Sequence, residues 1–340
     1  MTPKERFFAQ LEGKAVDRIP NFSILMNFAA KYVNKTMGEF CSDYRVLTEG
    51  ILKACEDFGI DILSTMSDPF RETADYGATH KFLPDTIPSC EKFITCPEDL
   101  HKLKPFKVED SVRMLDRVRA IEHFKSVAGE TYPVLGWVEG SAAESADLMG
   151  LTEYIYALYD EPEFVNDMMD ICLETAINCV DAQIKAGADI IGVGDAVAGV
   201  IGTGFYRDLI LPYEQKLFAE IKKRGAVARL HICGNITPLL EDIKTCGADI
   251  IDIDHMVDFR VAKEVLDGHA IVCGNFDPVW AVMSATPDSI AESVNRCIDE
   301  ADSKCIIMAG CEIPRDTPYE NLLAIHKALV ARGSMPGWAN

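Results

Sequence analysis

Gly187-Ala188-Asp189-Ile190-Ile191-Gly192-Val193-Gly194 is a short apolar stretch that opens on a Gly-Ala-Asp triplet. Near-copies of this triplet, Gly59-Ile60-Asp61 and Gly247-Ala248-Asp249, precede two further apolar stretches. Glycine suits the C-terminal cap of a helix, and the run that follows has the composition of a parallel strand buried on both faces. The triplets therefore predict units in which a helix ends and a parallel strand begins.

Apolar runs of strand length recur along the chain and are separated by helical segments. There are eight of them, at residues 20–26, 60–66, 133–138, 189–194, 227–232, 249–253, 270–273 and 305–309. Eight strands alternating with helices predict an α/β fold of the (β/α)8 TIM-barrel type. A doubly wound open sheet is the alternative, but no Gly-x-Gly-x-x-Gly follows the first run.

The length of 340 residues fits one such barrel, although roughly 150 residues per domain would allow two domains. No low-complexity linker divides the chain, so we expect a single domain over residues 1–340. Residues from about 67 to 131 are too many for one crossover. We expect an insertion there, after the second strand, on the face where barrels carry their active sites.

Acidic residues outnumber basic ones by 54 to 33, which gives a formal net charge of −21. Such a surface repels nucleic acid and anionic lipid, so we expect neither as a partner. The first residues lack a basic-then-apolar signal and no apolar run approaches the ~18 residues of a membrane helix, which favours a cytoplasmic protein. Its 12 cysteines are then reduced thiols, each a buried apolar residue, a metal ligand or a nucleophile.

Acidic residues stand where three of the predicted strands end. They are Asp68 after the second strand, Glu139 after the third and Asp195 after the fourth. Barrel enzymes carry their catalytic groups at the carboxyl ends of strands, so these three are candidate catalytic residues. Asp195 is alternatively a helix cap.

His231 and Cys233 end the fifth strand two residues apart, so their side chains point to the same side. Cys311 follows the eighth strand, at the same level of the barrel. Imidazole and thiolate are good Zn²⁺ ligands, and three protein ligands leave the open fourth position of a catalytic site. We therefore predict a catalytic zinc on these three residues, with Glu139, Asp195, water or substrate as the fourth ligand.

The alternative is that Cys233 and Cys311 are small core residues. Cys273, inside the seventh predicted strand, is a rival for the third ligand position. His255 follows Asp254 and is either an oriented base or a hydrogen-bonded structural histidine, of which we favour the second.

Several blocks of sequence carry a family resemblance. They are Thr2-Pro3-Lys4-Glu5-Arg6, Asp17-Arg18-Ile19-Pro20, Phe205-Tyr206-Arg207, Leu211-Pro212-Tyr213, His231-Ile232-Cys233-Gly234-Asn235, Gly274-Asn275-Phe276-Asp277-Pro278, Gly310-Cys311-Glu312-Ile313-Pro314 and Thr317-Pro318-Tyr319-Glu320-Asn321-Leu322. In this order, over nearly the whole chain, they resemble the uroporphyrinogen decarboxylase superfamily. The His-x-Cys pair and the late Cys311 resemble its branch of zinc- and corrinoid-dependent methyltransferases, such as the methylcobalamin:coenzyme M methyltransferases.

This resemblance implies a (β/α)8 barrel, zinc on the residues matching His231, Cys233 and Cys311, and a methyl group exchanged with a corrinoid such as methylcobalamin. The chain shows no corrinoid-binding segment, since Asp267-Gly268-His269 only mimics the Asp-x-His opening of one. We therefore expect a methyltransferase of one-carbon metabolism whose corrinoid is carried on a separate protein. The methyl group moves to or from a small thiol, methyl ether or methylamine.

Two other functions stay open at this point. Decarboxylases of the superfamily gather arginines after the first strand to bind a polycarboxylate tetrapyrrole, whereas residues 26–31 contain none. Asp68 nevertheless matches their acidic residue after strand two, which keeps a tetrapyrrole decarboxylase as the alternative. The third hypothesis is a non-catalytic corrinoid- or tetrapyrrole-binding module whose cysteines serve only in packing.

Overall fold

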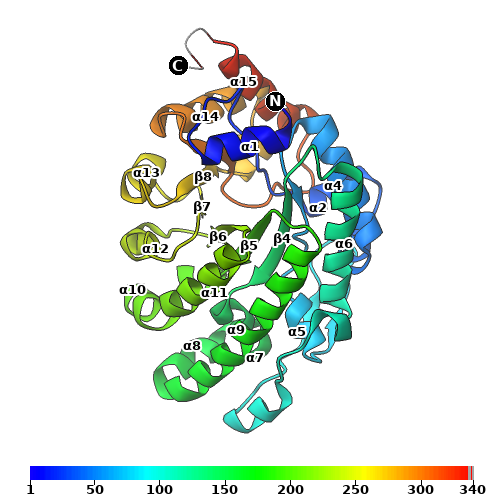
Figure 1. Cartoon of the computed structure of the whole chain (residues 1–340), viewed down its shortest axis with the longest axis vertical. Coiled ribbons are helices and arrows are strands. Elements are labelled where there is room, and N and C mark those ends of the chain that lie inside the picture. The colour runs from blue at the N-terminus through cyan, green and yellow to red at the C-terminus, as the bar shows by residue number, and fades with distance from the viewer. Residues whose placement is uncertain (336–337, 339–340) are drawn as a thin grey trace.

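A computed structural model describes residues 1–335 and 338, and this part of the chain forms a curled parallel sheet of seven strands with helices around its outside (Figure 1). The strands lie in the order β1 (Leu63–Ser64), β4 (Val134–Glu139), β5 (Ile190–Gly194), β6 (Val227–His231), β7 (Ile250–Ile253), β8 (Ile271–Phe276) and β9 (Cys305–Ala309). Each strand overlaps one predicted run, and the order of the strands in the sheet is their order in the chain. The carboxyl ends of all seven therefore lie at one edge.

The outer helices alternate with these strands. They are α4 (Tyr44–Phe58), α6 (Arg113–Ala128), α9 (Pro162–Lys185), α11 (Leu211–Lys223), α12 (Leu240–Ile243), α13 (Phe259–Leu266), α14 (Pro287–Glu300) and α15 (Tyr319–Gly333). The last of them, α15, packs against α14 and also against α4, so the layer of helices returns to its start. Within the described residues, no helix has the length and apolar composition needed to cross a membrane.

The three Gly-x-Asp triplets connect neighbouring strands in the same way. In each triplet, the main-chain N–H of the Asp donates to the carbonyl of one residue in the neighbouring segment of the sheet. The Asp carboxylate accepts from the main-chain N–H of that same neighbouring residue. The pairs are Asp61 with Asn21, Asp189 with Val134, and Asp249 with Ala228, at 2.7 to 3.0 Å. The carboxylate thus satisfies a donor that the parallel ladder leaves free.

The first predicted strand, residues 20–26, is much shorter in the structure. It is a single bridge between Asn21 and Ile307, with Phe22 N donating to the Ile307 carbonyl at 2.8 Å. Beyond it, Ser23 donates its N–H and hydroxyl to the Asn21 side chain, a local bond that competes with sheet pairing. Because Asn21 also pairs with Asp61, this segment lies between β9 and β1.

The segment between β1 and β4 holds α5 (Arg71–Asp75), the small hairpin of β2 (His80–Lys81) and β3 (Ser89–Cys90), two 3-10 turns (Pro97–Lys102 and Val108–Asp110) and α6. The predicted insertion, about residues 67–131, covers all of these elements. Its last helix, α6, packs against β4, α4 and α9, as a crossover helix does. Just after the hairpin, the N–H groups of Phe93 and Ile94 both donate to the Leu148 carbonyl, which attaches this segment to the rest of the fold.

The remaining α-helices are short. They are α1 (Pro3–Leu11), α2 (Asn27–Tyr32), α3 (Met37–Ser42), α7 (Ser141–Met149), α8 (Leu151–Asp160) and α10 (Thr203–Phe205). Of these, α7 begins directly after β4 and packs against α5 and α9. It therefore brings the polar residues of its first two turns to the carboxyl edge of the sheet.

Candidate metal centre and active site

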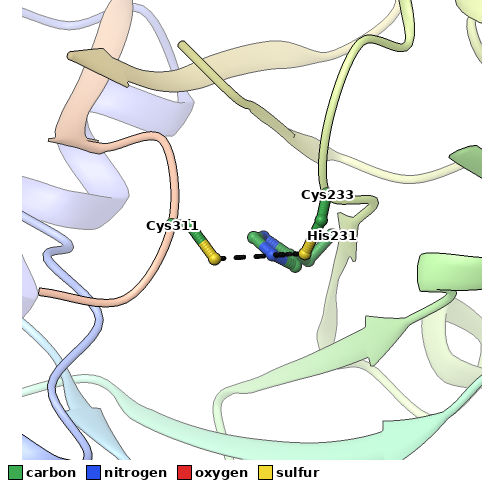
Figure 2. A group of neighbouring side chains, drawn as sticks. All are labelled: His231, Cys233 and Cys311. Carbon is green, nitrogen blue, oxygen red and sulfur yellow. Dashed lines mark hydrogen bonds between the residues drawn. The ribbon is translucent and has the colours of Figure 1, made fainter. Parts of the chain in front are cut away.

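His231, Cys233 and Cys311 converge at the carboxyl edge of the sheet. His231 is the last residue of β6, Cys233 lies in the loop that follows, and Cys311 points across from the loop after β9 (Figure 2). The His231 Nε2 atom is 3.1 Å from the Cys233 sulfur, and the two sulfurs are 3.9 Å apart. Two thiolates on one tetrahedral zinc stand about 3.8 Å apart, so the spacing of this donor set fits such an ion.

The protonation of this cluster follows from its hydrogen bonds. Burial alone lowers the pKa of His231, but its bonds with Asp252 and Cys311 outweigh burial and raise that pKa to about 10. The hydrogen bond from Cys233 and the nearby His231 lower the pKa of Cys311 to about 4, against the effect of burial. Without a metal the cluster therefore pairs a Cys311 thiolate with a protonated His231, and a metal that binds here would displace the proton on Nε2.

Glu139, the last residue of β4, occupies space left by glycines of β5. A Cβ atom on Gly194 would lie 2.8 Å from the Glu139 carboxylate, and one on Gly192 would lie 2.3 Å from the Trp137 ring. The Trp137 indole N–H donates to Glu139 at 2.8 Å, and its ring centroid is 6.3 Å from that of His231. The two glycines thus let a buried carboxyl group approach the strand that carries His231.

Asp195 follows β5 and is buried, with a carboxyl group that has no hydrogen-bond partner among the described residues. It lies against the first turn of α7, where a Cβ on Gly140 would be 2.4 Å from its carboxylate. Its main-chain N–H donates to the carbonyl of His231 at 3.0 Å. Burial raises the pKa of Asp195 to about 7.

This pKa predicts a pH-dependent stability. Between about pH 4 and pH 7 the folded chain keeps a proton on Asp195 that the unfolded chain has lost, so the free energy of unfolding falls as pH rises. In the Asp195→Asn variant the free energy of unfolding should fall less between about pH 4 and pH 7. At pH 8 the variant should be more stable than wild type by roughly 1–3 kcal/mol. Urea unfolding at pH 5 and pH 8 measures it, and Asp249→Asn, whose carboxylate is paired with Lys222, is the control. Equal slopes for Asp195→Asn and wild type would contradict the prediction.

Asp68 lies in the same region but is enclosed by arginines. Arg113, from α6, holds both of its oxygens at 2.8 and 2.7 Å, and the Asp68 side chain is fully buried. Although burial opposes ionisation, the Arg113 guanidinium keeps the pKa of Asp68 below its usual range. In this geometry Asp68 contacts Arg113 and the Ser67 hydroxyl, and its polar atoms are occupied.

Cys273 and His255, the two other residues considered for the site, lie outside the cluster of His231, Cys233 and Cys311. Cys273 is fully buried within β8 and does not belong to the group of metal-ligand atoms. His255 lies between two carboxylates, with Nδ1 2.8 Å from Asp254 and Nε2 3.4 Å from Asp277. Its hydrogen bond to Asp254 is a geometry that both interpretations of this histidine share.

Sequence reasoning missed Asp252, Arg229 and Trp137 as parts of this site. Asp252 is 2.9 Å from the His231 Nδ1 atom and pairs with Arg229. One signal was present: Asp252-Ile253-Asp254 ends β7 with the same spacing as His231-Ile232-Cys233 in the neighbouring strand.

A curled parallel sheet with outer helices, and with polar groups gathered at the carboxyl edge, defines the class of TIM-barrel-like α/β enzymes. The family is also identified, because the sequence profile of the family described as Uroporphyrinogen decarboxylase (URO-D) matches residues 2–331. The chain belongs to the uroporphyrinogen decarboxylase family.

Relatives with different names are similar to the chain over nearly its whole length. The methylcobamide:CoM methyltransferase MtbA of Methanosarcina mazei is 27% identical over 94% of this chain and 95% of its own. The uroporphyrinogen decarboxylase of Geobacter metallireducens is 28% identical over 94% of this chain and 96% of its own. The solved structure of a methyltransferase from Methanosarcina mazei has the same fold, with a TM-score of 0.88 at 22% identity over 96% of this chain and 98% of that one.

Proposed function

We propose that the protein is a zinc-dependent methyltransferase that moves a methyl group between a corrinoid and a small thiol, methyl ether or methylamine. The observation that carries this proposal is the convergence of one imidazole and two sulfur atoms within 4.8 Å of one another. The same three positions were predicted as ligands from strand ends alone. The similarity to methylcobamide:CoM methyltransferases supports the corrinoid as co-substrate.

The chain's own residues fit the role of holding the ion. Cys311 is poised as a thiolate, while the Asp252 carboxylate occupies His231 Nδ1 and leaves Nε2 on the side of the sulfurs. When bound, zinc would supply the Lewis acidity that keeps a substrate thiol deprotonated or withdraws charge from a departing heteroatom. Glu139 and Asp195 are buried carboxyl groups whose pKa values are raised by burial. We propose that they hold or move a proton at the substrate heteroatom.

A cavity of about 530 Å³ lies at the same edge of the sheet, next to Asp195 in the chain but not lined by the three ligand candidates, and its size suits a small substrate. Its lining includes Phe70 after β1, Asp147 from α7 and Ala196 and Val197 after β5, and it is mostly apolar. The corrinoid would be carried by a separate protein. In this chain Asp267-Gly268-His269 is only the turn between α13 and β8.

Asp68 favours the methyltransferase over the tetrapyrrole decarboxylase. A decarboxylase role requires this carboxylate to accept pyrrole N–H groups, but both of its oxygens are engaged by Arg113. Residues 26–31 supply one cation, Lys31, which pairs with Asp316. We propose that Asp68 acts indirectly, by holding Arg113 and the start of α6.

The finer architecture is part of the proposal. We propose that the Asn21 segment closes the sheet as the eighth strand of a (β/α)8 barrel, supported by its bonds to both β9 and β1. The chain would then be one domain over residues 1–340, with the segment of about residues 67–131 as its insertion after the second strand.

Metal content and methyl transfer test this function together. Protein purified without oxygen and with zinc supplied is expected to hold about one zinc per chain. It should demethylate methylcobalamin in the presence of an acceptor from a panel of small thiols, followed by the absorbance of the corrinoid. Removal of the ion with a chelator should abolish the reaction, and zinc should restore it. A metal-free protein that decarboxylates uroporphyrinogen would contradict the proposal.

A further inference from the structure

Two carboxylates at the end of β7 stand beside the three metal-ligand candidates. Asp252 is the register partner of His231 across the β6–β7 ladder, and Asp254 lies two residues further on. Side chains two residues apart on a strand share a face, so both carboxylates point to the side of the imidazole and the sulfurs. Asp252 and Asp254 therefore stand two residues apart at the end of β7, as His231 and Cys233 do at the end of β6.

Asp252 holds the histidine. One of its oxygens is 2.9 Å from His231 Nδ1, and the carboxylate also accepts from Arg229 Nε at 2.9 and 3.1 Å. Arg229 is in turn fixed by the Met308 sulfur, 3.2 Å from its Nη2, and by the Phe22 ring. Asp252 and Arg229 are each 1% exposed, so this chain of contacts is shielded from solvent.

Asp254 lies between the two loops that carry the cysteines. One of its oxygens accepts from the N–H of Gly234, the residue after Cys233, at 2.7 Å. The other accepts from the N–H of His255 at 2.7 Å and lies against Gly310, the residue before Cys311. A Cβ on Gly310 would come within 2.5 Å of that oxygen, so the contact is direct.

We propose that Asp252 and Asp254 are positioning residues that set the geometry of the metal site, Asp252 through His231 and Asp254 through the loops of Cys233 and Cys311. The inference rests on the proposed function, because it presupposes that these three residues bind a metal. Asp252 orients the ring and selects the tautomer that presents Nε2. Asp254 sets how far apart the two sulfurs stand, since it contacts the chain beside each.

Asparagine substitutions test this arrangement with little change in volume. Each of the two carboxylates accepts N–H donors on both of its oxygens, and an amide can accept on only one, so its NH₂ group would face a donor. The variants are Asp252→Asn and Asp254→Asn. The matched control is Asp249→Asn, which changes a carboxylate that also accepts a main-chain N–H beside β7, at the opposite edge of the sheet.

Two readouts besides activity are measured on the whole chain: zinc affinity by competition with a chromophoric chelator, and the absorption spectrum of the Co²⁺-loaded protein. Asp252→Asn and Asp254→Asn are each expected to weaken zinc roughly 10–100-fold. Asp254→Asn should in addition change the sulfur-to-cobalt charge-transfer bands, because the sulfurs move. Asp249→Asn should match wild type in both. If Asp252→Asn alone fails to fold, the double variant Asp252→Asn/Arg229→Met is used in its place. The second substitution removes the buried positive charge of Arg229, which Asp252 neutralises in the wild type.

The outcomes separate this inference from the proposed function. A wild-type chain that binds zinc, with both variants folded and equal to it in affinity and cobalt spectrum, would overturn the positioning role and leave the methyltransferase standing. A wild-type chain that binds neither zinc nor cobalt would overturn both. Loss of affinity in Asp249→Asn equal to that in the other two would show a general effect of removing charge, and would also refute the inference.

Discussion

Replacement of Cys311 by serine is expected to remove the bound metal and to lower methyl transfer by roughly 10³-fold or more, the equivalent of the several kcal/mol that a catalytic metal supplies. A serine hydroxyl stays protonated near neutral pH and is a poor zinc ligand, so only His231 and Cys233 remain. Cys311 is also the sulfur with the lowered pKa, so the variant loses the group that is poised as a thiolate. Metal per chain by mass spectrometry and corrinoid absorbance with a thiol acceptor measure the two effects.

The matched control for this prediction is Cys273→Ser. Cys273 was the rival for the third ligand position, and it is fully buried in β8 and does not belong to the group of ligand atoms. The variant should keep its metal and its activity once folded. If Cys273→Ser lost the metal while Cys311→Ser retained it, the ligand set assigned to the site would be wrong.

Replacement of Asp61 by alanine is expected to lower the free energy of unfolding by about 3–5 kcal/mol. The Asp61 carboxylate is 1% exposed and accepts from Arg6, from both Nη atoms of Arg18 and from the N–H of Asn21. Its removal leaves two largely buried guanidinium groups without this partner, and it removes one of the two hydrogen bonds between residue 61 and Asn21. Urea unfolding, followed by circular dichroism, measures the loss.

Asp249→Ala is the control, because it stands at the same place in its own Gly-x-Asp triplet. Its carboxylate is 27% exposed and pairs with a single exposed lysine, Lys222. An exposed pair of this kind contributes about 0–1 kcal/mol, so the loss should be clearly smaller. Equal losses in the two variants would mean that the buried arginines do not account for the role of Asp61.

Much of the fold followed from local pattern. Seven predicted runs became parallel strands in chain order, and the Gly-x-Asp triplets stand at the start of three of them. The length of the first strand was wrong, because Asn21 bonds Ser23 locally and pairing ends there. Periodicity shows that a stretch is apolar and extended, whereas its pairing depends on neighbours that are remote in the chain.

The metal-ligand candidates were predictable for a topological reason. In a parallel sheet all carboxyl ends meet at one edge, so His231, Cys233 and Cys311 could be brought together from their strand positions alone. The three acidic candidates share that edge, but strand position could not tell apart their environments. Asp68 pairs with Arg113 of α6, and Glu139 fills the space beside Gly194. Asp195 lies against α7, and its carboxyl group has no hydrogen-bond partner among the described residues.

The sequence by itself determined the order of the strands, the edge that carries the site and the His-Cys-Cys set, since each of these depends on local period and on the direction of the chain. Only the tertiary structure decided which carboxylates are neutralised, which are buried without such a partner and which contact the His-Cys-Cys cluster and its loops, as Asp252 and Asp254 do. The physical reason is that a charge is stabilised or destabilised by groups within a few ångströms, and those groups come from elements far apart in the chain.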